Sequence, residues 1–271
     1  MKIILSILIL FAILIFLGWL GFRIQPRPLA SYPQQSPPLQ TLPLPAGLPA
    51  PVERYYRQVY GDQIPMIESV VLTGRATMAP VAGLKIPARF RFVHQAGEGY
   101  RHYFEMTWFG LTIGTGNEIY LDGKSRLELP MGLSDEGAQV DQAANLSMWA
   151  EYVWLPAVFL TEPGVRWEAV DDETALLVVP FGDEEQTFVA RFDPATGNLA
   201  ILESMRYKDS KSIAKTLWLN ESSNWKIVGG YPMPTTGAVT WFDQGKPWAL
   251  FTIEDVVYNG DVQELIRRQG P

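Results

Sequence analysis

The chain has 271 residues, of which 47% are hydrophobic and 19% are charged. This balance is too apolar for a disordered protein and too mixed for one that crosses a membrane many times. With 22 basic and 29 acidic residues, the net charge of −7 argues against a nucleic-acid-binding protein, because such binding rests largely on Lys and Arg. Cysteine is absent and only two histidines occur, so we expect no disulfide, no metal ion and no other cofactor.

The N-terminus carries an uncharged run of 20 residues, at 3–22, dominated by Ile, Leu and Phe. At about 1.5 Å per residue, such a helix spans the roughly 30 Å hydrocarbon core of a bilayer. The run exceeds the apolar stretch of about 7–15 residues that is typical of a cleaved signal, so an uncleaved anchor at 1–23 is favoured. Lys2 on one side nearly balances Arg23 and Arg27 on the other, but short N-terminal anchors commonly export the domain behind them. We expect a single-pass cell-membrane protein with its C-terminal domain outside the cytoplasm; a cleaved signal is the alternative.

A proline-rich segment follows the apolar run. Nine of the 21 prolines lie between residues 26 and 51, where Arg27 is the only charged residue. Proline fixes φ and lacks an amide donor, so this segment cannot form a helix or a central strand. The composition predicts an extended linker over 24–50, which lifts a domain at 51–271 off the membrane.

The domain is predicted to be mostly β. A short helix is expected at 51–60, where apolar residues recur at helical spacing and Gly61 follows. After it, alternation of apolar and polar residues and intervening turn residues predict many short strands. The expected strands are 67–78, 84–94, 98–108, 112–121, 124–130, 165–170, 174–181, 186–193, 198–206, 214–220, 225–231, 237–242 and 248–258. Their short connections favour an antiparallel meander over a parallel sheet.

The strands at 84–94 and 98–108 are predicted to form a hairpin. Both place their apolar residues at even positions, so a loop of three residues at Gly97-Glu98-Gly99 keeps the two apolar rows on one face. The expected partners are Phe92 with Phe104, Phe90 with Met106, and His94 with His102.

One long helix is predicted over 134–160. Ser134 is a suitable N-cap, and apolar residues then recur at i, i+3, i+4 and i+7 from Leu146 onward. Pro156 should break or kink this helix near 152–155. The expected fold is mainly β (α+β): a curved antiparallel sheet or half-barrel with this helix packed on it, plus the N-terminal transmembrane helix.

The sequence carries few signals of catalytic chemistry. His94 and His102 could bind a metal, but no carboxylate can be placed beside them, so two side chains at the rim of a hairpin are favoured. The acidic clusters at 171–173 and 183–185 lie at predicted turns, where carboxylates are simply solvated, and Glu151 is a weaker candidate still. No nucleophile motif or phosphate-binding loop occurs. We assign no catalytic residue.

Aromatic content is the remaining distinctive feature, with 9 Trp, 11 Tyr and 13 Phe. In a purely structural interpretation, the covering helix fills this face of the sheet. In the functional interpretation, the helix covers the face only partly and leaves an apolar site for an acyl chain. The candidate ligand-binding residues are Phe90, Phe92, Phe104, Met106, Trp108 and Trp149.

Three stretches resemble landmarks of an uncharacterised bacterial family of unknown function, often found behind an N-terminal membrane segment. They are 48–56 (LPAPVERYY), 164–172 (GVRWEAVDD) and the helix ending Trp154-Leu155-Pro156. The resemblance covers residue 48 to the C-terminus and implies a fold similar to the envelope lipoprotein carriers of the LolA and LppX kind. It brings no catalytic residues, and this chain lacks the lipidated Cys of some envelope relatives.

These observations predict a membrane-anchored protein of the cell envelope that binds a lipid or another hydrophobic ligand and is not an enzyme. The expected partners are the membrane, through the N-terminal helix, and that ligand, but no nucleic acid; protein partners are not specified. Two alternatives stay open: an envelope hydrolase that uses carboxylates, and a structural or partner-binding module with a filled core.

Overall fold

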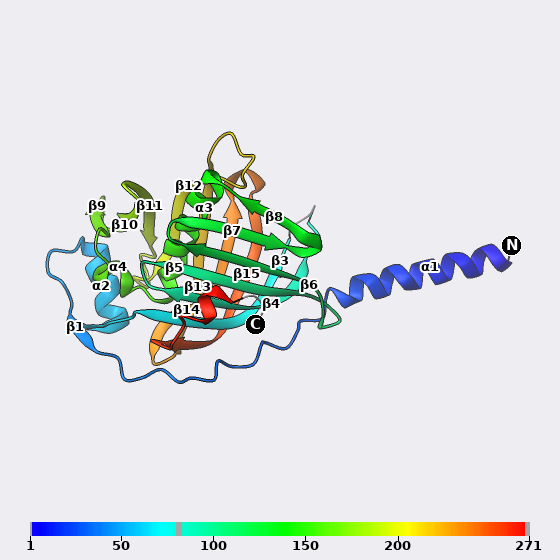
Figure 1. Cartoon of the computed structure of the whole chain (residues 1–271), viewed down its shortest axis with the longest axis horizontal. Coiled ribbons are helices and arrows are strands. Elements are labelled where there is room, and N and C mark those ends of the chain that lie inside the picture. Colours follow the sequence, from blue (N-terminus) through cyan, green and yellow to red (C-terminus); the bar gives the residue numbers. More distant parts are fainter. Residues whose placement is uncertain (1, 80–82, 269–271) are drawn as a thin grey trace.

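A computed structural model describes residues 2–79 and 83–268. Helix α1, Lys2–Gly21, projects from the domain as a single rod (Figure 1). Its stretch Ile3–Gly21 is long and apolar enough to cross a membrane, and none of its most apolar part is buried. The apolar helix predicted at the N-terminus is therefore present.

The domain is built on one antiparallel sheet of 13 strands in the order β8-β7-β6-β5-β4-β3-β15-β14-β13-β12-β11-β10-β9. The sheet is unclosed and curves around helix α3, which contacts strands of both halves (Figure 1). The strands are β3 Ser69–Met78, β4 Ile86–Gln95, β5 Gly99–Trp108, β6 Leu111–Leu121, β7 Lys124–Leu129, β8 Leu133–Glu136, β9 Arg166–Ala169, β10 Thr174–Phe181, β11 Glu184–Phe192, β12 Leu199–Arg206, β13 Thr216–Val228, β14 Tyr231–Trp241 and β15 Lys246–Tyr258. A separate pair joins β1, Thr41–Pro43, to β2, Gln63–Pro65.

This architecture confirms the predicted curved antiparallel sheet, with corrections among the strands: β8 was not predicted, and β14 begins at Tyr231 where the expected strand began at 237. The two strands expected at 214–220 and 225–231 are a single strand, β13, in which Asn224 adopts a left-handed φ of 55°. The chain turns only at Gly229 and Gly230, both with positive φ, which the alternation pattern had placed inside a strand.

The β4–β5 hairpin has a loop of three residues and a shared apolar face, as predicted, but the loop is at 96–98 instead of 97–99 and the register differs by two residues. Gln95 pairs with Gly99, Phe90 with Phe104 and Phe92 with His102, and His94 pairs with Tyr100 instead of the predicted His102. The reason lies in Gly99, which belongs to the strand and not to the turn. A Cβ there would lie 2.2 Å from the backbone oxygen of Tyr120 on β6, so only glycine allows this close approach.

The helices follow the predictions in part. Helix α2, Ala50–Tyr60, lies where it was expected and buries its apolar stripe. The long helix does not begin at Ser134, because that residue belongs to the edge strand β8. Helix α3, Ala138–Glu151, begins after Gly137 and is followed by the 3₁₀ turn η2, Tyr152–Trp154, and by α4, Val158–Thr161. The break predicted before Pro156 is confirmed.

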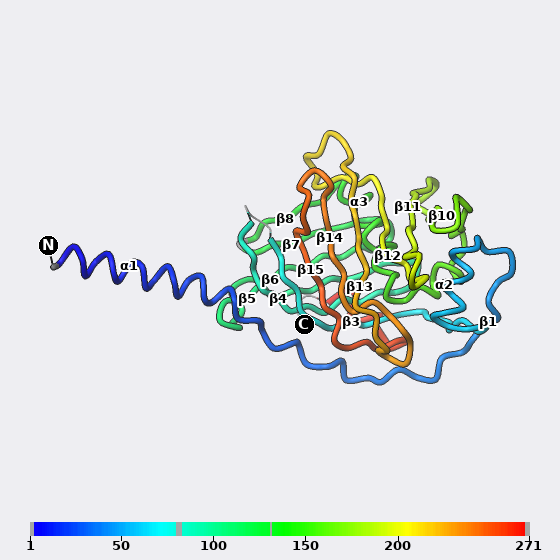
Figure 2. Tube along the Cα trace, turned by 180° about the vertical axis from the view of Figure 1, so that it is seen from behind, coloured from blue at the N-terminus to red at the C-terminus, as the bar shows by residue number. Residues whose placement is uncertain are grey.

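The proline-rich segment is extended, as its composition predicts, but it lies along the domain (Figure 2). The Tyr32 hydroxyl donates to the Asp261 carbonyl at 2.9 Å, and the Tyr258 N–H donates to Ser36 Oγ at 2.8 Å. It therefore forms a strap along the strands.

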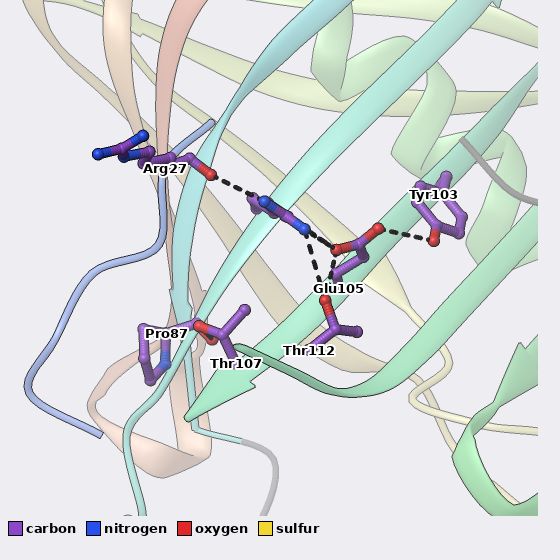
Figure 3. A network of polar contacts seen from close by, with 7 residues as sticks. Arg27, Pro87, Tyr103, Glu105, Thr107 and Thr112 are labelled. Carbon is purple, nitrogen blue, oxygen red and sulfur yellow. Dashed lines mark hydrogen bonds and ion pairs between the residues drawn. The ribbon is translucent and has the colours of Figure 1, made fainter. Parts of the chain in front are cut away.

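The strap is also held on the outer face of the sheet by Arg89, which donates to the Arg27 carbonyl at 3.4 Å (Figure 3). Glu105 orients that arginine and also accepts from Tyr103 at 2.9 Å and from Thr112 at 2.7 Å. Burial works against the charge, but these donors outweigh it and hold the pKa of Glu105 below its usual value. This network is structural, since all its groups are already paired with one another.

Candidate functional site

The inner face of the sheet carries the predicted ligand-binding row, and the structure divides it in two. Phe90 and Phe92 on β4 and Trp149 on α3 are buried, whereas Phe104, Met106 and Trp108 on β5 are only half-buried. The ring of Phe90 lies 4.4 Å from that of Phe92 and 5.6 Å from that of Phe251. Trp149 packs on Tyr152, with ring centroids 5.1 Å apart. The buried half of the row is thus packed core, and the half on β5 stays partly open.

Two hollows of about 310 Å³ each lie elsewhere among the described residues. One is at the β6–β8 edge and includes Arg126 and Glu128; the other includes Glu98 and Arg267. None of the six predicted ligand-binding residues lines either hollow. The open half of the row is therefore an apolar surface at the end of the sheet.

This open end is the place where helix α1 joins the domain. The indole N–H of Trp108 donates to the Gly18 carbonyl at 3.0 Å, and the Phe109 N–H donates to the Gly21 carbonyl at 2.9 Å. A Cβ on Gly21 would lie 2.0 Å from the Trp108 indole, so the helix end fits against this ring only as glycine. Leu111 beside it is 70% exposed.

More exposed apolar residues lie on the same edge. Ile113, on β6, is 54% exposed. The neighbouring strands β7 and β8 end in the pair Leu129 and Leu133, which are also exposed. We call Leu111, Ile113, Leu129 and Leu133 the apolar edge; Leu111 pairs with Trp108, and Leu129 and Leu133 line the hollow at the β6–β8 edge.

A polar cluster lies deeper on the same face. His94 on β4 and His102 on β5 are buried, with 0% and 6% exposure, so the prediction that they sit at the rim of the hairpin is wrong. Glu151, the last residue of α3, reaches between them. Its Oε2 lies 2.9 Å from His94 Nε2 and 2.8 Å from His102 Nε2. The fold thereby supplies the carboxylate that could not be placed from the sequence.

A second carboxylate extends the cluster. Glu118 on β6 lies 3.3 Å from His102 Nδ1 and accepts a hydrogen bond of 2.8 Å from the Tyr100 hydroxyl. Arg206 on β12 completes it, with its guanidinium 4.3 Å from the centre of the Trp218 ring and an attractive interaction with Glu118. The inner face thus holds a charged cluster beneath its aromatic row.

The pKa values of the two histidines are shifted in opposite directions. Burial lowers the pKa of His102, but Glu151 and Glu118 outweigh burial and raise it to about 9. Burial also opposes the charge of Glu151, but the imidazoles outweigh it and lower its pKa to about 2. For His94 burial is the larger effect, so its pKa lies below the usual value. With His102 and Arg206 positive, the charges of the two glutamates are balanced.

The acidic clusters are exposed, as predicted, although Glu184 and Glu185 belong to strand β11 and not to the turn before it. Residues 171–173 and 183–185 are exposed, and Glu185 pairs with Arg166 at the surface. Sequence reasoning missed Glu151 as a partner of the histidines, although a signal existed: it is the only charged residue between Asp141 and Glu162. A single charge in such an apolar stretch is typical of a buried, paired group.

Comparisons with known proteins show a family and find solved structures of low similarity. A family model described as a family of unknown function, DUF6544, matches residues 38–252. A LolA superfamily protein from Nitrosomonas europaea is similar at 13% identity, with 82% of this chain and 99% of that one covered and a TM-score of 0.48. A DUF1329 family protein from Desulfovibrio piger gives 10% identity, 75% and 91% coverage and a TM-score of 0.44. No curated protein matches the sequence.

Proposed function

The chain belongs to this family of unknown function, DUF6544, and we propose from its geometry that it is a membrane-anchored protein that binds the acyl chain of a lipid, without catalysis. The acyl chain would lie on the open half of the aromatic row, against Phe104, Met106 and Trp108. One observation carries the proposal: this half lies at the end of strand β5 to which α1 is hydrogen-bonded.

The position of α1 supports a bilayer as the neighbour of that edge. A helix of 20 residues spans the hydrocarbon core once, so its C-terminal end lies near the membrane surface. Trp19 and Arg23 at this end, with the guanidinium 4.7 Å from the ring centre, are typical of an interfacial anchor. The apolar edge would then face the headgroup and acyl region, where exposed Leu and Ile are favourable.

Contacts of the helix end with the domain support retention of the helix. Cleavage at the sites usual for a signal would remove the carbonyls of Gly18 and Gly21, and with them both hydrogen bonds to the β5–β6 hairpin. The proposal therefore places an uncleaved anchor in the cell membrane and the sheet domain outside the cytoplasm.

Two glycines shape the floor of the open half. A Cβ on Gly116 would lie 2.0 Å from the Phe104 ring, and one on Gly114 would lie 3.0 Å from the Pro130 ring and 3.2 Å from the end of Met106. Because β6 has no side chains there, both β5 residues can lie flat across it. The result is a broad apolar surface. An acyl chain that covers it would be stabilised by about 25 cal/mol for each Å² of apolar surface removed from water.

Lipid binding can be tested with a charge placed on this floor. In Met106→Arg, an arginine would face the acyl chain, and burying its charge there without a partner is unfavourable. We expect binding of a fluorescent fatty acid by the full-length protein in detergent to weaken at least about tenfold, or about 1.4 kcal/mol. Lipid recovered with the purified protein, measured by mass spectrometry, should fall in parallel.

Met205→Arg is the matched control, because Met205 is 50% exposed and lies on β12, outside the row. It should bind the fatty acid as the natural protein does, and thermal unfolding should show that both variants are folded. The proposal fails if the natural protein binds no fatty acid, or if both arginine variants bind it equally well.

A further inference from the structure

We propose that His94, His102 and Glu151 form a binding site for a single divalent transition-metal ion, with Zn²⁺ as the best fit. This inference is independent of the lipid proposal, since it rests on the polar cluster alone. The composition had suggested no metal because a third ligand was missing; helix α3 provides it.

The spacing of the donor atoms suits one ion. One ligand atom from each of the three residues can be chosen so that all lie within 4.8 Å of one another. Zinc binds imidazole nitrogen at about 2.0–2.1 Å and carboxylate oxygen at about 2.0–2.2 Å, so tetrahedral ligand atoms lie about 3.3 Å apart. The two Nε2 atoms now lie 2.9 and 2.8 Å from one Glu151 oxygen. A small rotation of that carboxylate would therefore admit the ion.

The surroundings of His102 favour metal binding through its Nε2. Glu118 lies beside the other ring nitrogen, Nδ1, and is itself held by the Tyr100 hydroxyl. A carboxylate on the far nitrogen of a histidine fixes the ring and leaves the near nitrogen free to bind the metal. Glu118 is therefore a positioning residue and not a ligand.

His94 provides an independent observation. The ring is completely buried, and neither of its nitrogens has a hydrogen bond of good geometry among the described residues, although Nε2 lies close to Glu151. Buried polar groups are nearly always paired, so such an imidazole calls for a partner. A metal ion between His94 Nε2, His102 Nε2 and Glu151 supplies a partner for Nε2.

The chemistry of the donors selects the ion. Two imidazoles and one carboxylate suit zinc and its neighbours and are a poor match for Ca²⁺ or Mg²⁺, which prefer oxygen ligands. The Glu151 side chain keeps 17% exposure, so the cluster is not sealed from solvent. Three protein ligands leave one position of a tetrahedral ion for water or a further ligand.

The competing explanation is that a proton on His102, and not a metal, holds the cluster together. Because the chain has only two histidines, the natural protein distinguishes the two cases without any mutation. Full-length protein with ¹⁵N-labelled histidine is stripped with a chelator and titrated with Zn²⁺. We expect one equivalent of Zn²⁺ to shift the ring nitrogens of both histidines together. If Zn²⁺ leaves either ring unchanged, the proposal is overturned and the proton-held cluster is the correct account.

Variants give a second test, with Co²⁺ as a coloured substitute for zinc. The natural protein should show the strong visible absorption of a four-coordinate Co²⁺ site. We expect His94→Phe, His102→Phe and Glu151→Gln each to weaken Zn²⁺ binding at least about 100-fold. Glu118→Gln should weaken it by about 10–100-fold while the Co²⁺ spectrum keeps its form, as expected for a positioning residue.

Glu162→Gln is the matched control, since Glu162 follows helix α4 and lies outside the cluster. It should bind Zn²⁺ like the natural protein. Equal binding by Glu151→Gln and Glu162→Gln would show that zinc sits elsewhere on the acidic surface and would overturn the proposal. If a histidine variant does not fold, the labelled natural protein still decides the question.

Discussion

The Glu151→Gln variant is expected to unfold with a free energy about 3 kcal/mol lower than that of the natural protein, in a buffer with a chelator. Glu151 is the one carboxylate that both buried histidines face, and its charge is the largest of the effects by which Glu151 and Glu118 keep His102 protonated. Removing one partner of a buried ion pair leaves the other charge without compensation, which costs about 3–5 kcal/mol when burial is complete. Denaturant unfolding followed by tryptophan fluorescence measures the loss.

Glu185→Gln is the control for Glu151→Gln. It also removes an ion pair, the one between Glu185 and Arg166, but this pair lies at the surface. Both of these side chains are about half exposed, at 53% and 47%. Exposed ion pairs contribute up to about 1 kcal/mol, so the loss should be much smaller. Similar losses of unfolding free energy in the two variants would show that the buried ion pairs of Glu151 stabilise the protein no more than a surface ion pair does.

The Gly74→Ala variant is expected to lose about 3 kcal/mol of stability or to misfold. Gly74 lies in β3, at the centre of the sheet, and a Cβ there would meet the Thr252 backbone oxygen of β15 at 2.0 Å and the Phe90 ring at 2.9 Å. A backbone atom cannot move aside as a side chain can, so the two strands must separate or the sheet must shift. Thermal unfolding and denaturant titration check the result.

Gly237→Ala is the comparison for this second variant. Gly237 also lies inside a strand, β14, but a Cβ there would meet only the Trp154 ring, at 3.3 Å. We expect a change within about 1 kcal/mol, since a small shift of the ring relieves the contact. The close approach of β3 and β15 would be contradicted if Gly74→Ala were as stable as Gly237→Ala.

Much of this fold could be predicted because its information is local. Alternation along the chain placed β3 to β7 and β9 to β12 within a few residues, and Pro156 predicted the break after α3. The wrong predictions concern residues whose structure depends on contacts with strands that the local sequence does not reveal. Gly99 looks like a turn residue until β6 is known to pass beside it, and Ser134 looks like a helix cap until β8 pairs with β7.

The candidate site, too, could be predicted only where the local sequence determines the position of a residue. The strand parity of β4 and β5 was enough to place His94 and His102 on the aromatic face. Glu151, however, is 49 residues from His102 in the sequence, and no local pattern connects them. The open half of the row could not be foreseen either, because it depends on which residues the helices leave uncovered and on where α1 meets the β5–β6 hairpin.

The position of the apolar edge in the bilayer tests the account most directly. The chain has no cysteine, so Ile113→Cys and Ile227→Cys each carry one fluorescent label at a known site. Ile227 is 75% exposed, near the β13–β14 turn where Tyr231 packs on Tyr60 of α2, on the far side of the domain from α1 (Figure 1). In vesicles with nitroxide-bearing lipids, quenching of the label at 113 but not at 227 is the predicted result. Equal accessibility of both labels to water, without quenching by the lipids, would contradict a sheet that opens onto the membrane.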